Sequence, residues 1–192
     1  MPYFSIITPS LMRPSLVATC DSIDSQTFRD FEHIVQLDVE TIDNLIFARI
    51  DHPQRWVFQC ERPHRDGGNT CRRLAWEKST GIYQWCVDDD NTVADERILE
   101  DMADALECAG RPDWGLFSIT RLGLRFYADP PRSCHVDSMN VVIKREFAQW
   151  PDTDSYCSDG ILVDGLIERG IPYAAFPDHR PIGVIPVISG CR

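Results

Sequence analysis

The sequence predicts an α/β domain in which helices cover both faces of a mostly parallel sheet. In the first half, short apolar runs alternate with stretches of helical character, and this order is typical of such sheets. A length of 192 residues allows one domain with an apolar core and is short for two. A hydrophobic fraction of 43% and a charged fraction of 26% are typical of globular proteins. We therefore expect one domain that spans residues 1–192.

Four strands and two helices are predicted in the first half, residues 1–91. The strands are the apolar runs Tyr3–Thr8, Phe31–Leu37, Trp56–Cys60 and Ile82–Val87. The helices are Ser15–Gln26, with apolar residues at helical spacing, and Asn69–Ser79. Pro14 stands where the first turn of a helix tolerates proline, and Gly81 follows the second helix, as glycine often does.

The second half, residues 92–192, has a less regular pattern, and we expect it to add antiparallel strands. Its predicted elements are the helices Asp95–Ala109 and Ser158–Arg169 and the strands Trp114–Thr120, Asn140–Lys144 and Pro172–Phe176. The segment Arg125–Ser138 contains two adjacent prolines and little periodicity, so we expect a loop over the ligand pocket. The apolar stretch Ile182–Ile188 is either an edge strand or a tail that lies on the sheet.

The charge balance argues against nucleic acid as a main partner. The net charge is −11 and the sequence pI is about 4.8, and an acidic protein repels phosphates. A local group of arginines can still bind a small anionic ligand, and this group is Arg62, Arg65, Arg72 and Arg73. No apolar stretch is long enough to span a bilayer. The N-terminus lacks the basic region and cleavage site of a signal peptide, so we expect a cytoplasmic protein.

The eight cysteines include no Cys-x-x-Cys pair. Their even number permits a disulfide framework, but without a secretory signal we expect reduced and mostly buried thiols. A zinc cluster is typically made of closely spaced ligand pairs, and the sequence contains none.

The acidic triplet Asp88–Asp90 directly follows an apolar predicted strand. Adjacent carboxylates repel one another unless solvent or a cation relieves the repulsion, and Mg²⁺ or Mn²⁺ often links carboxylates to substrate phosphates. A solvated turn that caps the next helix is the alternative. Thr8–Ser10 and Asp38 also follow strands, and ligands of parallel sheets bind beyond the carboxyl ends of the strands. These three segments therefore predict a pocket.

An ordered set of segments resembles family 2 glycosyltransferases of the GT-A fold, over roughly residues 3–176. The opening resembles the family at Phe4–Ser10, Ser25–Phe28 and Phe31–Val35. Cys71–Ala75 followed by Gly81-Ile82-Tyr83 is similar to the family's Ala-Arg-Asn-x-Gly and Gly-Glu-Tyr block, with Arg72 on the family's arginine.

The same register places further residues on the family's motifs. Asp88 and Asp90 fall on the two acids of its Asp-x-Asp motif, and Asp159 falls on the acid before the late helix. The sequence departs from the family at Arg73, Ala75 and Ser158, where the family has asparagine, glycine and glutamate. The resemblance implies a GT-A-like three-layer αβα fold, with a nucleotide-sugar-binding half (residues 1–91) and an acceptor-side half (residues 92–192).

The resemblance also implies a metal-dependent, inverting transfer of a sugar from a nucleotide-sugar donor to an acceptor hydroxyl. Mn²⁺ or Mg²⁺ would be held by Asp90, with Asp88 as its partner near the metal or the ribose. Asp89 would be a spacer that faces away, or part of the turn. His179 follows the last predicted strand and would be an additional metal ligand, although a lone histidine is more often an ordinary surface residue.

A nucleotide site is implied at the ends of the first two strands. Asp38 would accept hydrogen bonds from the nucleotide base, with a plain turn residue as the alternative. Thr8 and Pro9 would line the base and the ribose. Ser10 and Arg13, in the loop that follows the same strand, are assigned to the same site.

The diphosphate and the acceptor also have implied partners. Arg72 would face the diphosphate, because a planar and permanently charged donor suits it, and Arg65 would reach the same phosphates from a flexible loop. Exposed surface cations are the alternative, since four arginines cannot all enter one small site. Asp159 would take the proton from the acceptor hydroxyl, and its alternative role is a helix N-cap.

Two other functions remain open at this stage. A nucleotidyltransferase on a similar sheet usually carries a glycine-rich basic loop after the first strand, and Pro9–Arg13 contains no glycine. The second open function is a catalytically inactive module that binds a nucleotide sugar. It is considered because the chain is short for the family and departs from the family's motifs. The base, the sugar, the acceptor and the oligomeric state are not indicated by the sequence.

Overall fold

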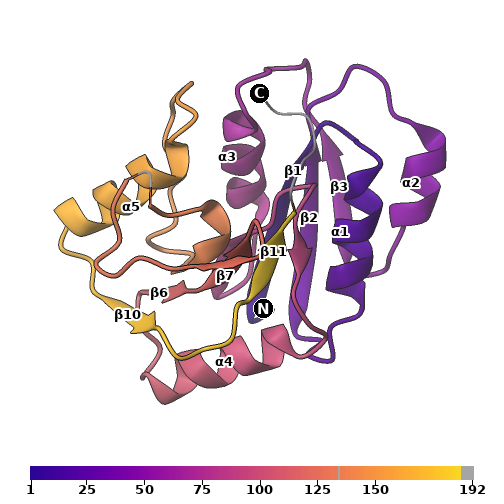
Figure 1. Cartoon of the computed structure of the whole chain (residues 1–192). Coiled ribbons are helices and arrows are strands. Elements are labelled where there is room, and N and C mark those ends of the chain that lie inside the picture. Colours follow the sequence, from indigo (N-terminus) through magenta and orange to yellow (C-terminus); the bar gives the residue numbers. More distant parts are fainter. Residues whose placement is uncertain (134, 187–192) are drawn as a thin grey trace.

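The computed structural model describes residues 1–133 and 135–186, and its core is a sheet of seven strands (Figure 1). The strands lie in the order β10 (Tyr173–Phe176), β6 (Trp114–Phe117), β9 (Val141–Lys144), β4 (Tyr83–Cys86), β1 (Phe4–Ser10), β2 (Phe31–Leu37) and β3 (Arg55–Gln59). Strands β4, β1, β2 and β3 are parallel, whereas β9 is antiparallel to both β4 and β6. The predicted mostly parallel sheet with an antiparallel addition from the second half is confirmed.

Helices cover both faces of this sheet. The helices on one face are α1 (Ser15–Asp24), α2 (Asn44–Ile50) and α4 (Ile98–Cys108), and those on the other are α3 (Asn69–Lys78) and α5 (Ser158–Glu168). Side chains of β1 alternate between the faces: Phe4 and Ile6 pack with α4, and Ile7 packs with α3 and α5. Figure 1 shows the strands β1 to β3 between α3 and α1. The three-layer αβα arrangement predicted from the sequence is therefore confirmed.

The parallel strands position the candidate site. All seven residues of β1 are buried, as in a central strand that is covered on both faces. Because β1, β2, β3 and β4 are parallel, their carboxyl ends lie along one edge of the sheet. This edge brings together Ser10, Asp38, Cys60 and Asp88, which end the four strands or follow them within two residues.

A second, smaller sheet contains four short strands in the order β5 (Thr92–Val93), β11 (Gly183–Ile185), β7 (Ile119–Arg121) and β8 (Leu124–Phe126). Strand β11 pairs antiparallel with β5 and parallel with β7. The stretch predicted as an edge strand or tail, Ile182–Ile188, is thus an inner strand of this sheet as far as residue 185, and residues 187 and 188 lie outside the described residues.

Two further differences from the sequence prediction have local causes. Helix α2 was not predicted because its apolar residues do not mark one buried face: Leu45 and Phe47 are exposed, and only Ile50 is buried. Its start is instead set by Asp43, whose carboxylate accepts hydrogen bonds from the backbone of Leu45 and Ile46. The predicted strand Trp114–Thr120 is divided into β6 and β7, which belong to different sheets. In the described part of the chain, no helix has the length and apolar character needed to cross a membrane.

Candidate functional site

The middle residue of the acidic triplet, Asp89, is buried and lies in the turn that follows β4, so of its two predicted roles it is part of the turn and not a spacer that faces away. Its side chain is 1% exposed and accepts hydrogen bonds from Ser10 Oγ at 2.7 Å, Leu11 N at 3.2 Å and Arg13 Nη2 at 2.6 Å. A carboxylate buried at the edge of the sheet is stable only when such donors satisfy it. Through these hydrogen bonds Asp89 connects the loop after β1 with the turn after β4.

The first residue of the triplet, Asp88, forms an ion pair with Arg72 of α3. Arg72 Nη2 lies 2.5 Å from Asp88 Oδ1, and Arg72 Nη1 donates to the backbone oxygen of Gly67 at 2.9 Å. The guanidinium also lies over the ring of Trp150, 4.9 Å from its centroid. Arg72 Nε is buried and has no hydrogen-bond partner among the described residues. Arg72 is thus a buried cation whose Nε–H has no hydrogen-bond acceptor among the described residues.

The glycine before α3 is required by this arrangement. Gly68 has a φ of +83°, a left-handed conformation that glycine adopts most easily. A Cβ at this position would lie 3.1 Å from Arg72 Nη1 and 3.1 Å from Pro9 Cβ. The close approach of the loop therefore holds the guanidinium of Arg72 against the end of β1.

Two further carboxylates lie within electrostatic reach of Asp88. Burial, together with the negative charges of Asp88 and Asp159, raises the pKa of Asp137 to about 6. Burial and the charge of Asp88 also raise the pKa of Asp159, whereas the Gly160 N–H and the positive charge of Arg72 oppose this shift. We call Arg72, Asp88, Asp137 and Asp159 the charged cluster.

Asp137 is the member of the charged cluster that the sequence analysis missed. It precedes the short 3₁₀ helix η1 (Ser138–Asn140), and its carboxylate accepts the backbone N–H of Met139 at 3.0 Å. The side chain of Asn140 in turn accepts the backbone N–H of Asp137 at 2.9 Å. This reciprocal cap, Asp-x-x-Asn before a strand, is a local sequence signal that could have drawn attention to the position.

Asp90 remains accessible at the end of the triplet. Its side chain is 22% exposed, and its one ion pair with a described residue is a long contact of 3.4 Å with Arg13 Nη1. Burial and the charges of Asp88 and Asp89 raise the pKa of Asp90, while Arg13 opposes this shift. A divalent cation would relieve the repulsion, and the carboxylate oxygens of Asp88 and Asp90 are the hard donors that Mg²⁺ and Mn²⁺ prefer. These residues therefore fit the predicted metal ion.

His179 does not form a metal-ligand group with Asp88 and Asp90 among the described residues. Within the described ranges, the side chains of Asp88, Asp90 and His179 do not form a group whose ligand atoms lie within 4.8 Å of one another. His179 Nδ1 lies 2.7 Å from the backbone oxygen of Arg180, and its ring packs edge-on against Phe117 with centroids 5.1 Å apart. The structure therefore holds His179 at the end of β6 by packing.

Asp38 organises the loop after β3. Its two carboxylate oxygens accept the backbone N–H groups of His64, at 2.7 Å, and Arg65, at 2.8 Å, and the residue is only 5% exposed. The side chain of Arg65 is exposed, and its φ of 56° marks a tight turn. Of the four arginines noted in the sequence, Arg72 is the buried one, which agrees with the expectation that they do not all enter one site.

Thr8 supports the site from within the sheet. It is fully buried, and its hydroxyl lies 2.9 Å from His33 Nε2 of the neighbouring strand. This hydrogen bond directs the hydroxyl of Thr8 toward another side chain within the sheet, and the role of Thr8 beside the base and ribose stays a prediction. Ser10 is similarly committed to Asp89, whereas Pro9 packs near Gly68.

The start of α5 excludes the alternative role of Asp159 as an N-cap. The cap position is Cys157, which makes no side-chain capping hydrogen bond, and the helix begins at Ser158. Asp159 lies within the first turn, where its Oδ1 accepts the N–H of Gly160 at 2.8 Å. Its second carboxylate oxygen makes no hydrogen bond with any described residue that would prevent it from accepting a proton.

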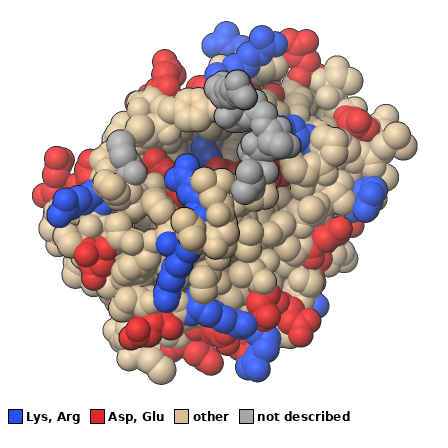
Figure 2. Space-filling model, viewed as in Figure 1, with Lys and Arg blue, Asp and Glu red and all other residues tan. Residues whose placement is uncertain are grey.

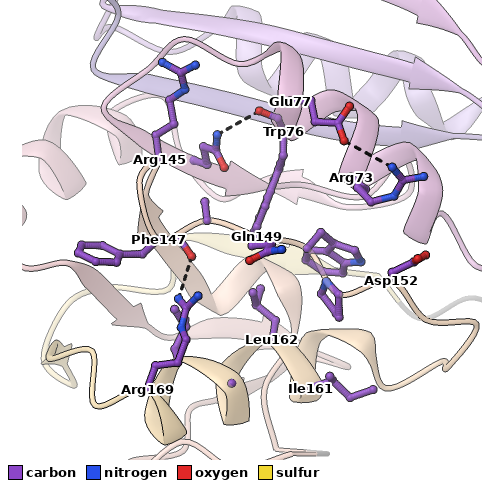
Figure 3. A pocket seen from close by; sticks show the side chains of 16 residues that line it. Arg73, Trp76, Glu77, Arg145, Phe147, Gln149, Asp152, Ile161, Leu162 and Arg169 are labelled. Atoms are coloured by element: carbon purple, nitrogen blue, oxygen red, sulfur yellow. Dashed lines mark hydrogen bonds and ion pairs between the residues drawn. The ribbon is translucent and has the colours of Figure 1, made fainter.

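A cavity of about 590 Å³ lies between α3, the segment 145–152 and α5 (Figure 3). Its walls include the aromatic rings of Trp76, Phe147 and Trp150 and the guanidinium groups of Arg73, Arg145 and Arg169. The ring of Trp150 packs edge-on against Trp76 and also contacts Arg72, so it connects this cavity with the charged cluster.

The acidic net charge is not uniform over the surface. On the face shown in Figure 2, several Lys and Arg side chains run through the middle, and further Lys and Arg side chains lie near the margins among the Asp and Glu side chains. A small anion can therefore approach this face although the whole chain has a charge of −11.

Comparisons with known proteins reveal similarity in fold. No protein-family profile and no curated protein matches the sequence. S. aureus TarS matches over 97% of this chain and 37% of its own, with 16% identity and a TM-score of 0.74. TarS 1–349 in complex with UDP matches over 96% of this chain and 60% of its own, with 18% identity and a TM-score of 0.75.

A mannosyltransferase from Pyrobaculum calidifontis, PcManGT, in complex with GDP-Man and Mn²⁺, matches over 98% of this chain and 58% of its own. Its identity is 15% and its TM-score 0.73. The chain thus spans between 37% and 60% of the length of these proteins. At these identities the likeness establishes a shared GT-A-like fold.

Proposed function

We propose that this domain transfers a sugar from a nucleoside-diphosphate sugar to an acceptor hydroxyl. The observation that carries the proposal is the buried Arg72–Asp88 pair, with Asp90 and Asp159 beside it, at the strand ends where this type of sheet binds ligands. The shared fold adds support, because similar structures contain UDP or GDP-Man with Mn²⁺.

Residues of the first half would bind the donor. Arg72 would pair with the diphosphate through its guanidinium, and the exposed Arg65 would reach the same phosphates. Asp38 would bind the base with its remaining lone pairs while it holds the loop at His64 and Arg65. Pro9 would pack against the nucleotide.

Asp88 and Asp90 would hold the divalent cation. When bound, the cation would stabilise the negative charge on the departing diphosphate. Asp89, Ser10 and Arg13 would keep the two carboxylates in place from the side of β1. His179 would be at most an additional ligand, since it is held by Phe117 and Arg180.

Asp159 would act as the base. Its carboxylate would take the proton of the acceptor hydroxyl while that oxygen forms a bond to the anomeric carbon. The bond from this carbon to the diphosphate breaks, and the nucleoside diphosphate leaves with the bonding electron pair. Attack from the face opposite the diphosphate inverts the anomeric configuration. Burial raises the pKa of Asp159, which makes its carboxylate a better proton acceptor near neutral pH.

The two alternatives have specific counter-observations. A nucleotidyltransferase would hold a triphosphate with the loop after β1, but Arg13 of this loop is paired with Asp89 and Asp90. An inactive module was suggested by departures from the family motifs at Arg73, Ala75 and Ser158. Arg73 pairs with Glu77 at the cavity of Figure 3, so this departure lies outside the charged cluster.

A thermal-shift panel of UDP, GDP, UDP-GlcNAc and GDP-mannose, with and without Mn²⁺, tests the proposal. A selective ligand raises the Tm by mass action, and Asp90→Ala should remove the part of the shift that depends on Mn²⁺. An unchanged Tm with all four compounds would contradict the donor assignment. An unchanged Mn²⁺-dependent shift in Asp90→Ala would contradict the metal assignment.

Turnover separates the remaining functions. Hydrolysis of the selected donor should release nucleoside diphosphate, and Asp159→Asn should abolish it. Release of pyrophosphate from a nucleoside triphosphate and a sugar phosphate would favour the nucleotidyltransferase instead. Binding without hydrolysis, even with a panel of hydroxyl acceptors, would favour the inactive module.

A further inference from the structure

Two cysteines that are distant in the sequence meet beside Asp38. Cys60 directly follows β3, and its backbone N–H donates to Leu37 at the end of β2, which places it next to Asp38. Cys71 lies in the first turn of α3, and this helix packs against β1 and β2. The sheet edge and the helix start therefore bring three potential metal ligands to one point.

The ligand atoms of Asp38, Cys60 and Cys71 all lie within 4.8 Å of one another. This is the one group of three such side chains found in residues 1–133 and 135–186. All three residues are nearly inaccessible to solvent, at 5%, 5% and 1% exposure. The absence of closely spaced ligand pairs in the sequence argued against a zinc site, but Asp38, Cys60 and Cys71 are distant in the chain and meet only in the fold.

The distance between the two sulfurs suits a tetrahedral cation. Cys60 Sγ and Cys71 Sγ are 3.6 Å apart. Two thiolates at about 2.3 Å from a tetrahedral Zn²⁺ would be separated by about 3.8 Å, whereas a disulfide requires about 2.0 Å. The observed separation is therefore close to that of two ligands of one zinc ion.

Neighbouring groups are arranged as the outer partners of such ligands. The amide of Gln36 donates to Cys60 Sγ at 3.5 Å, and the backbone of His64 and Arg65 donates to Asp38. Hydrogen bonds of this kind orient metal-binding thiolates and carboxylates. Each carboxylate oxygen of Asp38 retains one lone pair, so one oxygen can bind a cation while the other remains for the nucleotide base.

We propose that Asp38, Cys60 and Cys71 bind a soft divalent cation of the zinc class, with a fourth ligand from water or the adjoining loop. The site is separate from the one assigned to Mn²⁺ or Mg²⁺, because thiolates favour zinc and carboxylates alone favour the harder ions. It would tie the ends of β2 and β3 to the start of α3.

Zinc content of the full chain tests the proposal. Reduced protein is treated with a chelator, loaded with Zn²⁺, desalted and analysed by mass spectrometry of the metal. We expect about one bound equivalent in the wild type and in Cys20→Ala, a buried cysteine of α1, as for other closed zinc sites. Cys60→Ala and Cys71→Ala should each lose it. Equal zinc in the wild type and the Cys60→Ala/Cys71→Ala double variant would overturn the proposal.

Two additional measurements keep the result clear if a variant folds poorly. Wild-type protein loaded with Co²⁺ should show the near-ultraviolet charge-transfer absorption of sulfur–cobalt bonds, and its absence would also overturn the proposal. Asp90→Ala should lose Mn²⁺-dependent nucleotide binding and keep zinc. Loss of zinc in Asp90→Ala would place the cation at the acidic triplet and contradict the assignment to Cys60 and Cys71.

Discussion

Arg72 and Asp88 form an ion pair at the end of β4, with Nη2 and Oδ1 2.5 Å apart. The Arg72 side chain is 8% exposed and that of Asp88 is 28% exposed. Burial of the guanidinium lowers the pKa of Arg72, and the negative charge of Asp88 and other nearby groups raise it. The raising effects together are larger, so the pKa of Arg72 lies above its ordinary value. A pair of this kind is sensitive to the removal of either partner, because the other charge stays buried.

The first prediction concerns this pair. Arg72→Ala should lower the free energy of unfolding by about 3 kcal/mol, the lower end for a broken buried pair, because Asp88 is partly solvated. Urea unfolding followed by circular dichroism measures the change. Arg73→Ala is the matched control, since its 3.4 Å pair with Glu77 is exposed and contributes at most about 0.5 kcal/mol. Equal losses in the two variants would contradict the special role of Arg72.

The second prediction separates the neighbours Asp89 and Asp90. Asp89→Asn should lower the free energy of unfolding by about 2 kcal/mol, because an amide cannot accept all three donors that the carboxylate satisfies. Asp90→Asn should change it by less than about 0.5 kcal/mol, or raise it, because the charged form of Asp90 is disfavoured in the fold. Urea unfolding of both variants measures these changes. A larger loss of stability in Asp90→Asn than in Asp89→Asn would show that Asp89 is the spacer.

The third prediction is a pH dependence that arises from Asp137. Its folded-state pKa of about 6 lies above the ordinary 3.8, so the folded protein binds this proton more tightly than the unfolded chain. The contribution to stability is therefore favourable below pH 3.8 and is lost as the pH rises through about 6. Asp137→Asn should reduce this loss, because an amide keeps an acceptor for the Met139 N–H and does not ionise.

Thermal unfolding between pH 4 and pH 7.5 tests the role of Asp137 in the range where its pKa is shifted. The wild type and Asp137→Asn should approach one another at acidic pH and diverge at neutral pH, with the variant more stable. Asp154→Asn, which removes an exposed carboxylate, should follow the wild type. Parallel curves for the wild type and Asp137→Asn would assign the dependence to another group.

The strands of the first half could be predicted because their apolar runs are continuous. Phe31–Leu37 was predicted with the bounds of β2, and the run before the acidic triplet contains β4, Tyr83–Cys86. Such runs are legible in the sequence because strands covered on both faces need apolar residues at successive positions. Helix α2 also contains an apolar run, Leu45–Ala48, but only Ile50 of this helix is buried, so the run did not indicate which residues pack on the sheet.

The candidate site was predicted less completely because its contacts are between distant segments. The positions of Asp88 and Asp159 follow from motif order, but the burial of Asp89 depends on Ser10 and Arg13, almost eighty residues away. The place of Asp137 depends on the antiparallel insertion of β9 between β4 and β6, which no local pattern predicts. Long-range packing decides which carboxylates meet.

The fourth prediction concerns Asp159 and depends on the proposed transfer reaction. Asp159→Asn should reduce kcat at least about 100-fold, the usual effect of losing a general base, and leave nucleoside-diphosphate binding with Mn²⁺ unchanged. Because only the ionised carboxylate accepts a proton, the wild-type rate should fall as the pH drops through the pKa of Asp159. Burial raises this pKa, so the fall should begin above the range of an ordinary aspartate.

Initial rates with the donor selected by thermal shift, measured against pH, test the role of Asp159. Asp164→Asn is the control, because it removes another carboxylate from α5 outside the charged cluster and should retain the wild-type rate and pH profile. A rate within tenfold of the wild type in Asp159→Asn would show that another group takes the proton. Asp137 would then be the next residue to replace, because its raised pKa of about 6 and its charge coupling to Asp159 place a second proton acceptor in the same cluster.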